Sequence, residues 1–290
     1  MAMSELSIRA LSDMLQQTST RAQAVQELQL TLHRLLEMFL PDPAEFCALL
    51  TDTASVITGH AALWFMLRDE QQPKPRSLTV SCPLHRFDRV YDFLMKLPGA
   101  SADPYPEDLF LSNDDRVDGL GIRKRMRVKS DGGLIELLES DSFTAFQPIP
   151  FQSGTHMMNV LCPGHFISPY AKLTLKGIAF APRLLGHRLI RHLPIYDTTE
   201  FKFHTRPSDV SDVGQTCYMF PACPKRVRTF GDDDCFTVSF TQSPLLSMDE
   251  IQMDSTCTAW RLGGVPCGNR RCFLDVERMV ETDLEFSPFA

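Results

Sequence analysis

The chain has 290 residues, of which 43% are hydrophobic and 22% are charged, and its formal net charge is −7. This composition is typical of a globular protein with one substantial core or two smaller ones. The negative charge argues against broad, charge-driven binding to nucleic acid or to an anionic membrane surface. Any anionic ligand would therefore need a pocket of its own.

The N-terminal residues and the cysteines favour a reducing compartment inside the cell. The opening residues, Met1 to Glu5, lack the basic patch and apolar run of a secretory leader, and no segment approaches the roughly 20 apolar residues of a membrane span. The nine cysteines are odd in number and widely spaced, which favours reduced thiols over a disulfide framework. We expect a soluble cytoplasmic protein, with the nucleus as the alternative location and no membrane partner.

The first 70 residues predict helices around one short strand. Apolar residues recur at helical spacing over 4–39, and Thr20 with Gln23 forms a capping-box pattern that predicts the start of a second helix. Asp42 followed by Pro43 is a typical helix start. The β-favouring residues 55–58 end at Gly59, and an apolar helix is expected over 60–67.

The next elements alternate between strand and helix. We expect a strand at 78–82, a helix at 86–97 and a long connection over 98–119. Residues 122–129 and 134–139 predict a hairpin, because the Asp and Gly residues between them suit a tight turn. Further on, Thr155 predicts a capped helix start, residues 172–177 predict a strand or turn, and residues 183–192 predict a basic amphipathic segment.

One face of the expected hairpin is basic. Arg123, Arg125, Arg127 and Lys129 alternate with other residues along the first strand. The favoured interpretation is the solvated outer face of an antiparallel sheet, because period-two alternation is typical of any half-exposed strand. The alternative is a strip that binds an anion or nucleic acid.

The order of these elements resembles the minimal nucleotidyltransferase core, in which a strand ends in Gly-Ser or Gly-Gly, a helix follows, and the next strand carries Asp-x-Asp. Several segments also resemble the landmarks of an uncharacterised protein family of mushroom-forming fungi, over residues 42–240. These segments are 56–59, 75–80, 87–94, 155–160, 170–174 and 217–228.

The resemblance implies an α/β (α+β) fold, with a nucleotidyltransferase-like mixed sheet and flanking helices. We divide the chain accordingly into a helical extension at 1–40, a nucleotidyltransferase-like core at 41–205, and a Cys-containing C-terminal segment at 206–290 packed on the core.

The acids of such a core are missing. Carboxylates one residue apart on a strand point to the same face and, with a third acid, hold two divalent ions. Here Ser77 and Thr79 occupy the pair of positions, and only Glu136 could replace the third acid. Gly59 and His60 would complete the lining of a ligand-binding cleft. If the registration were wrong, Asp114-Asp115 or Asp232-Asp233-Asp234 could supply acids, but we expect both runs to be solvated loops.

Other candidate sites give weaker signals. Six cysteines gather in the last quarter of the chain, but their spacing fits zinc poorly, so buried thiols are favoured and no cofactor is expected. Cys162 lies between His156 and His165, yet nothing indicates the exposed thiolate and oriented base of a nucleophile.

The favoured hypothesis is therefore a degenerate nucleotidyltransferase fold that binds a small molecule or a protein, without metal-dependent nucleotidyl transfer. The alternative is an enzyme that reuses the same cleft for a nucleotide or small-molecule reaction. Nucleic-acid binding through Arg123, Arg125, Arg127 and Lys129 is a third hypothesis, and it predicts affinity that falls steeply with salt.

Overall fold

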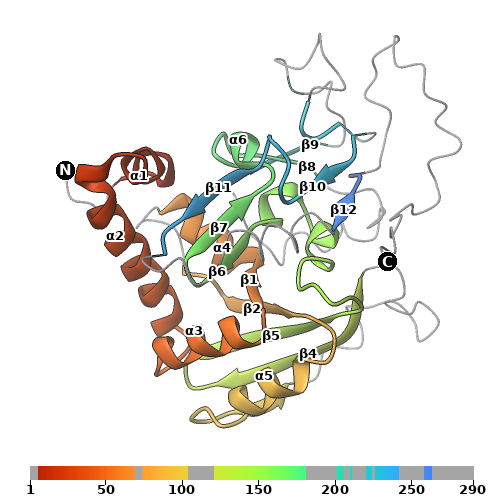
Figure 1. The fold of residues 1–290 in the computed structure, drawn as a ribbon. Coiled ribbons are helices and arrows are strands. Elements are labelled where there is room, and N and C mark those ends of the chain that lie inside the picture. The colour runs from red at the N-terminus through yellow and green to blue at the C-terminus, as the bar shows by residue number, and fades with distance from the viewer. Residues whose placement is uncertain are drawn as a thin grey trace, which may run out of the picture. The chain divides into compact units, whose positions relative to one another are not determined.

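The computed structural model is a mixed α/β fold in which helices flank a mixed sheet of eight strands (Figure 1). The fold class expected from the sequence is confirmed at this level. The residues that the structure describes are 6–68, 74–103, 121–180, 201–204, 210, 220–223, 226–241 and 258–262.

The elements have the following bounds. The helices are α1 (Ile8–Leu15), α2 (Thr18–Glu37), α3 (Pro43–Asp52), α4 (Gly59–Leu67), α5 (Phe87–Leu94) and α6 (Ala171–Thr174), with short 3-10 helices η3 (Ile149–Phe151) and η4 (Thr155–Met157). The strands are β1 (Val56–Thr58), β2 (Ser77–Cys82), β3 (Ser101–Asp103), β4 (Ile122–Ser130), β5 (Gly133–Ser140), β6 (Val160–Cys162), β7 (His165–Ser168), β8 (Ile178–Phe180), β9 (Lys202–His204), β10 (Arg228–Thr229), β11 (Phe236–Ser239) and β12 (Ala259–Trp260).

Two helix starts test the capping predictions. The Asp42 side chain accepts a hydrogen bond from the Glu45 amide at 2.9 Å, and α3 begins at Pro43, as expected. The predicted capping box at Thr20 is wrong, because α2 begins two residues earlier. The Thr20 hydroxyl instead donates to the Met14 carbonyl at 2.9 Å, which ties the start of α2 to the end of α1.

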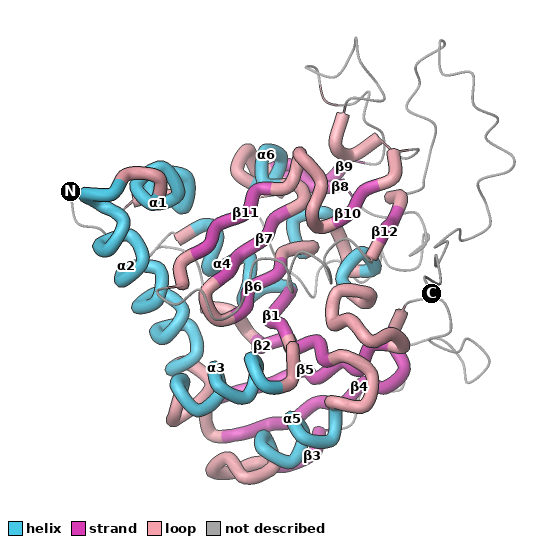
Figure 2. Tube along the Cα trace, viewed as in Figure 1, coloured by secondary structure: helices cyan, strands magenta, loops and turns pink. Residues whose placement is uncertain are grey.

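The large sheet has the strand order β11-β7-β6-β1-β2-β5-β4-β3. Strand β1 is antiparallel to β2 and β6, whereas β2 and β5 run parallel. The antiparallel hairpin of β4 and β5 is confirmed, and Figure 2 shows these two strands beside β2. Gly59 therefore follows a strand that lies inside a mixed sheet, next to β2.

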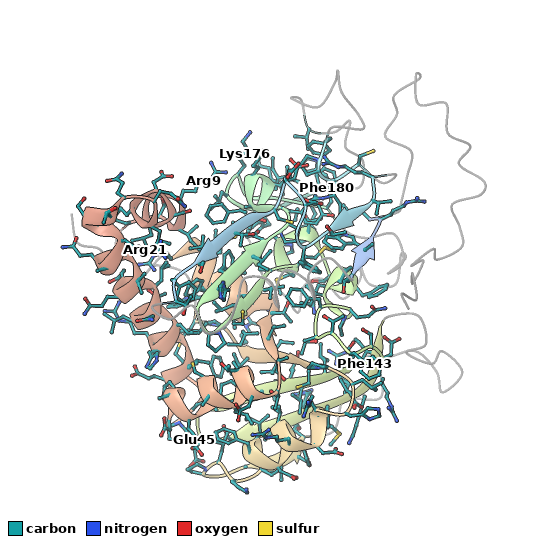
Figure 3. All side chains as sticks on the ribbon, in the orientation of Figure 1. Arg9, Arg21, Glu45, Phe143, Lys176 and Phe180 are labelled. Atoms are coloured by element: carbon teal, nitrogen blue, oxygen red, sulfur yellow. The ribbon has the colours of Figure 1, made fainter. Side chains whose placement is uncertain are left out.

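In the part of the sheet from β2 to β4, one face is apolar and the other face carries polar side chains. Leu78, Val80, Ile135 and Leu137 are fully buried on one face, and α5 packs there, with the Lys124 amine 4.3 Å from the centre of the Phe87 ring. The opposite face carries Ser77, Thr79 and Glu136. The segment after β5 covers part of it, because the Ser81 hydroxyl donates to the Ala145 carbonyl at 2.7 Å. Phe143 in that segment is 80% exposed (Figure 3).

Three further segments differ from their sequence predictions, and a fourth lies outside the described residues. Thr155 starts the 3-10 helix η4 without capping it, because its hydroxyl accepts from the Phe180 amide at 3.0 Å. Residues 172–177 are mainly the helix α6 and a following turn (Figure 2). The connection expected at 98–119 contains β3, which is too short to give an alternating pattern. The basic segment 183–192 lies outside the described residues.

The chain forms two compact units. Unit 1 contains residues 1–148, 159–167 and 237–248, and unit 2 contains residues 149–158, 168–236 and 249–290. The three-part division expected from the sequence stays a prediction. Within the described parts of the chain, no helix is both long enough and apolar enough to cross a membrane.

Candidate functional site

A row of five polar side chains crosses the sheet of unit 1. Thr58 pairs with Thr79, Thr79 with Glu136, Glu136 with Arg127, and Arg127 with Asp103. Side chains of residues directly opposite each other in neighbouring strands point to the same face. These five residues, here called the polar row, therefore share the face opposite to α5.

Glu136 is the centre of the polar row. Its Oε2 atom accepts a hydrogen bond from the Thr79 hydroxyl at 3.3 Å and lies 4.0 Å from Nη2 of Arg125. Arg127 makes a closer ion pair with Asp103, at 2.6 Å. The side chains of Glu136, Arg125 and Arg127 are 17%, 23% and 19% exposed, so all three reach solvent through a small part of their surface.

Two positions on β2 hold hydroxyls where the resemblance to a nucleotidyltransferase core leads one to expect carboxylates. Ser77 lies two residues before Thr79 on β2 and therefore on the same face. Glu136 is the carboxylate beside them, and two guanidinium groups neighbour it on β4. Among the residues that the structure describes, no three His, Cys, Asp or Glu side chains are arranged to hold a metal ion. Each of the two guanidinium groups has a carboxylate within 4.0 Å.

Gly59 and His60 lie at the start of α4, directly after Thr58. Gly59 has a φ of 68°, which suits glycine at this sharp change from strand to helix. The Thr58 hydroxyl donates to the Asn159 carbonyl at 2.8 Å, so no side chain at this position caps α4. Burial, with the nearby charge of Arg76, lowers the pKa of His60 to about 4. His60 is therefore neutral at neutral pH.

The structure thus brings Thr79 and Glu136 into contact and places Ser77 two residues before Thr79 on β2. Gly59 and His60 directly follow Thr58, the partner of Thr79 in β1. Sequence reasoning missed Thr58 and Asp103, because their membership of the polar row depends on strand pairing across long separations. Such neighbours become visible only when the pairing of the strands is known.

The basic strand β4 fits neither interpretation of its sequence completely, that is, neither a solvated outer face nor a strip that binds an anion or nucleic acid. Arg123 is 54% exposed and lies at an irregularity of β4, where it is 4.0 Å from Glu139. Arg125 and Arg127 are mostly buried and have carboxylates beside them. The strand is therefore neither a fully solvated face nor a continuous exposed strip, and nucleic-acid binding stays a prediction.

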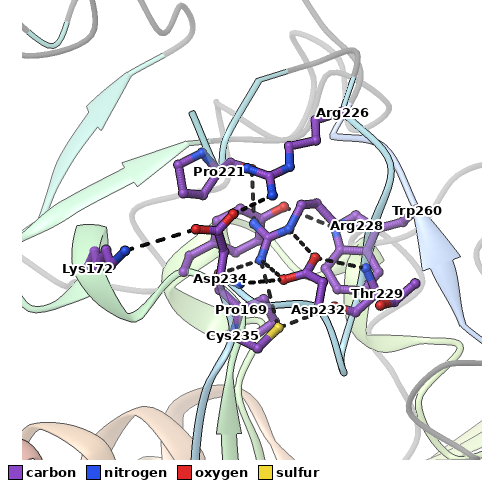
Figure 4. A network of polar contacts seen from close by, with 11 residues as sticks. Pro169, Lys172, Pro221, Arg226, Arg228, Thr229, Asp232, Asp234, Cys235 and Trp260 are labelled. Atoms are coloured by element: carbon purple, nitrogen blue, oxygen red, sulfur yellow. Dashed lines mark hydrogen bonds and ion pairs between the residues drawn. The ribbon is translucent and has the colours of Figure 1, made fainter. Parts of the chain in front are cut away.

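Unit 2 contains a cluster around a buried arginine (Figure 4). Arg228 is 1% exposed, and its guanidinium donates twice to Asp232, at 2.5 and 2.9 Å. It also donates to the carbonyls of Pro221 and Pro169, at 3.0 and 2.9 Å. The Asp232 carboxylate accepts further bonds from two backbone amides. The expectation that residues 232–234 form a solvated loop is therefore wrong for Asp232, because the buried guanidinium requires a partner.

The aromatic and thiol groups of this cluster complete its packing. The guanidinium carbon of Arg228 lies 4.9 Å from the centre of the Tyr170 ring, whose hydroxyl accepts from the Trp260 indole at 3.0 Å. The Cys235 thiol donates to the Thr229 carbonyl at 3.2 Å, and burial raises its pKa to about 12. A protonated thiol is a poor nucleophile, so the cluster has the properties of a structural core.

Cys162, which lies between His156 and His165 in the sequence, is a buried thiol. The Cys162 thiol is 3.7 Å from the backbone carbonyl of His165, and burial raises the pKa of this thiol to about 12. In the described part of unit 2, Cys223 is buried and Cys235 is a thiol. The other four cysteines of the C-terminal quarter, Cys217, Cys257, Cys267 and Cys272, lie outside the described residues.

Comparisons of the sequence with protein-family models and with curated proteins give no match. The functional argument therefore depends on the geometry of the polar row and its neighbours.

Proposed function

We propose that this protein is a degenerate member of the nucleotidyltransferase-like fold that binds its ligand without metal-dependent nucleotidyl transfer. The site would consist of Gly59, His60, Ser77, Thr79 and Glu136. One observation carries the proposal: Glu136, which the resemblance would put in place of the third acid, accepts from the Thr79 hydroxyl and lies 4.0 Å from Arg125. The resemblance to the fungal family belongs to the same proposal.

The charges around Glu136 support binding over metal chemistry. Divalent magnesium needs oxygen ligands that carry negative charge, and two-metal catalysis needs several carboxylates on one face. Ser77 and Thr79 are neutral, and Arg125 repels any cation placed beside Glu136. A neutral ligand meets no such repulsion, whereas an anion would be repelled by the Glu136 carboxylate.

The test is a thermal-shift series with nucleoside triphosphates, with and without magnesium or manganese. Only a ligand that binds the native state preferentially raises the melting temperature. We expect stabilisation by a ligand, where it occurs, to be the same with and without metal. Stabilisation of the wild-type protein that requires the metal would contradict the proposal.

A designed gain of function gives the positive control. The double variant Ser77→Asp, Thr79→Asp restores two carboxylates on the face of Glu136. We expect manganese alone to raise the melting temperature of this variant and to leave the wild type unchanged. The variant Ser19→Asp, Gln26→Asp adds the same number of carboxylates at exposed positions of α2, outside the sheet, and serves as the control.

The alternative, an enzyme that reuses the same residues, predicts turnover. Incubation of the wild-type protein with the stabilising ligand, followed by product analysis, separates it from a binding protein. A product that disappears in the variant Glu136→Gln would favour the enzyme.

A further inference from the structure

The hairpin of β6 and β7 places a thiol beside an imidazole. Cys162 and His165 are directly opposite each other in this antiparallel pair, so their side chains point to the same face, with β carbons about 5 Å apart. Pro163 and Gly164 form the turn between them, and Gly164 has a φ of 90°, which suits glycine. The Gly164 carbonyl accepts from the Phe240 amide at 2.7 Å. The turn therefore keeps the thiol and the imidazole in one register.

The His165 side chain has an unusual environment for a polar group. The residue is 1% exposed, and neither ring nitrogen has a hydrogen-bond partner among the residues that the structure describes. Buried polar side chains are nearly always hydrogen-bonded, so an imidazole with two unused nitrogens requires an explanation, and a bound ion is one. The Cys162 thiol opposite it is a weak donor, and its contact with the backbone carbonyl of His165 is 3.7 Å long. Both side chains can therefore bind an ion between them.

The two donor atoms suit a soft metal ion. Thiolate sulfur selects soft ions such as monovalent copper, and imidazole nitrogen also binds copper. Metal bonds of about 2.3 Å to sulfur and about 2.0 Å to nitrogen place the donors about 4 Å apart, which two side chains with β carbons about 5 Å apart can reach. Zinc usually takes four ligands, whereas monovalent copper accepts two. A pair of ligands is therefore sufficient for copper alone of these two metals.

The charge of the surroundings favours a monovalent ion. Burial lowers the pKa of His165 and raises the pKa of the Cys162 thiol to about 12, and no charged side chain among the described residues contributes to either shift. A thiolate and a monovalent ion together carry no net charge. A divalent ion would leave one uncompensated positive charge in a buried place, which is unfavourable.

We propose that Cys162 and His165 form a two-coordinate site for a monovalent copper ion. On binding, the Cys162 sulfur releases its proton to solvent and forms the bond to copper, and one nitrogen of the neutral His165 ring forms the second bond. The ion stays monovalent, so no oxidant or reductant takes part. Strand β7 is second from the edge of the sheet, where local opening admits the ion. This site does not depend on the proposed function.

The test is a titration of monovalent copper into the reduced, full-length protein in the presence of a chromogenic chelator that competes for the ion. We expect Cys162→Ser to bind one equivalent fewer than the wild type. His165→Gln should hold this ion at least about tenfold more weakly, since even an outer partner of a metal ligand contributes that much. Cys162→Ala and His165→Leu, which suit buried positions, repeat the measurements if the first variants do not fold.

A second buried thiol of unit 1 provides the matched control. Cys82 is fully buried on β2 and lies opposite Glu139, not opposite a histidine. We expect Cys82→Ser to bind the same number of copper ions as the wild type, with the same affinity. Loss of one equivalent in this control as well as in Cys162→Ser would show that any buried thiol binds the ion, and would overturn the inference.

Two further results would overturn it. Equal stoichiometry in the wild type and Cys162→Ser would show that this thiol binds no copper, and wild-type affinity in His165→Gln would reduce the site to a lone thiol. Zinc that is bound by the wild type and lost in both variants would contradict the choice of a monovalent ion. The proposed function fails on a different result, namely metal-dependent stabilisation by nucleotides.

Discussion

His60 shows how one partly buried side chain couples stability to pH. Burial and the charge of Arg76 lower its pKa from the ordinary 6.5 to about 4 in the folded protein. The unfolded chain therefore binds a proton more readily than the folded chain. The stability associated with neutral His60 is fully present above pH 6.5 and is lost as pH falls towards 4.

We expect the variant His60→Asn to flatten this loss of stability between pH 6.5 and 4. The measurement is the free energy of unfolding in urea at several pH values. His85 is exposed and has a φ of 66°, a conformation that asparagine tolerates, so His85→Asn is the matched control. Part of the slope should remain in His60→Asn, because burial also lowers the pKa of His165. An unchanged slope would show that His60 is solvated.

The N-terminal helices of unit 1 are anchored by one residue at the end of α4. Arg68 ends α4 with a φ of 52°, and its guanidinium binds Glu27 at 2.8 Å and Thr31 at 2.7 Å on α2. Its Nε atom donates to the Leu6 carbonyl before α1, at 3.0 Å. The helices α1 and α2 therefore contact the elements that follow β1 in unit 1.

We expect Arg68→Ala to destabilise unit 1 by about 3 kcal/mol, because it leaves the buried Glu27 carboxylate without this partner. The side chains of Arg68 and Glu27 are 3% and 9% exposed. Arg34 approaches the same carboxylate at 3.9 Å but is 55% exposed, so Arg34→Ala should cost less than about 1 kcal/mol. Chemical unfolding followed by circular dichroism measures both. Equal losses would mean that the position of Arg68 gives no special stabilisation.

At the scale of the whole molecule, each compact unit has its own core and its own tryptophan. Trp64 belongs to unit 1 on α4, and Trp260 belongs to unit 2, where it contacts Phe230 and Tyr170. Fluorescence of Trp260 in a Trp64→Phe background therefore reports on unit 2. The Arg228 cluster is the feature of unit 2 that this signal can test.

In that background we expect Asp232→Asn to lower the stability of unit 2 by about 3 kcal/mol, since Arg228 would lose its charged partner. The adjacent Asp233 is exposed, so Asp233→Asn should change stability by less than about 0.5 kcal/mol. Burial raises the pKa of Asp232, but the hydrogen bond and charge of Arg228 outweigh it, and the net pKa is lowered. The contribution of Asp232 should therefore persist at neutral pH and disappear in acid.

Local patterns were sufficient for much of the fold. The cap at Asp42, the apolar helix after Gly59 and the hairpin of β4 and β5 were predictable, because each depends on residues close together in the sequence. The capping box at Thr20 failed because contacts with the end of α1 started the helix earlier. Strand β3 was missed because three residues of an edge strand carry almost no periodic signal.

The sequence by itself determined that Ser77 and Thr79 are neutral and share one face of a strand, since residue identity and the period of a strand need no tertiary contacts. Only the tertiary structure decided that Glu136 lies between Thr79 and Arg125, and that Asp232 belongs to a buried cluster. These neighbours depend on strand register and chain folding over long separations, where many pairings are compatible with the same local pattern. The electrostatic character of each site is therefore a property of the assembled chain.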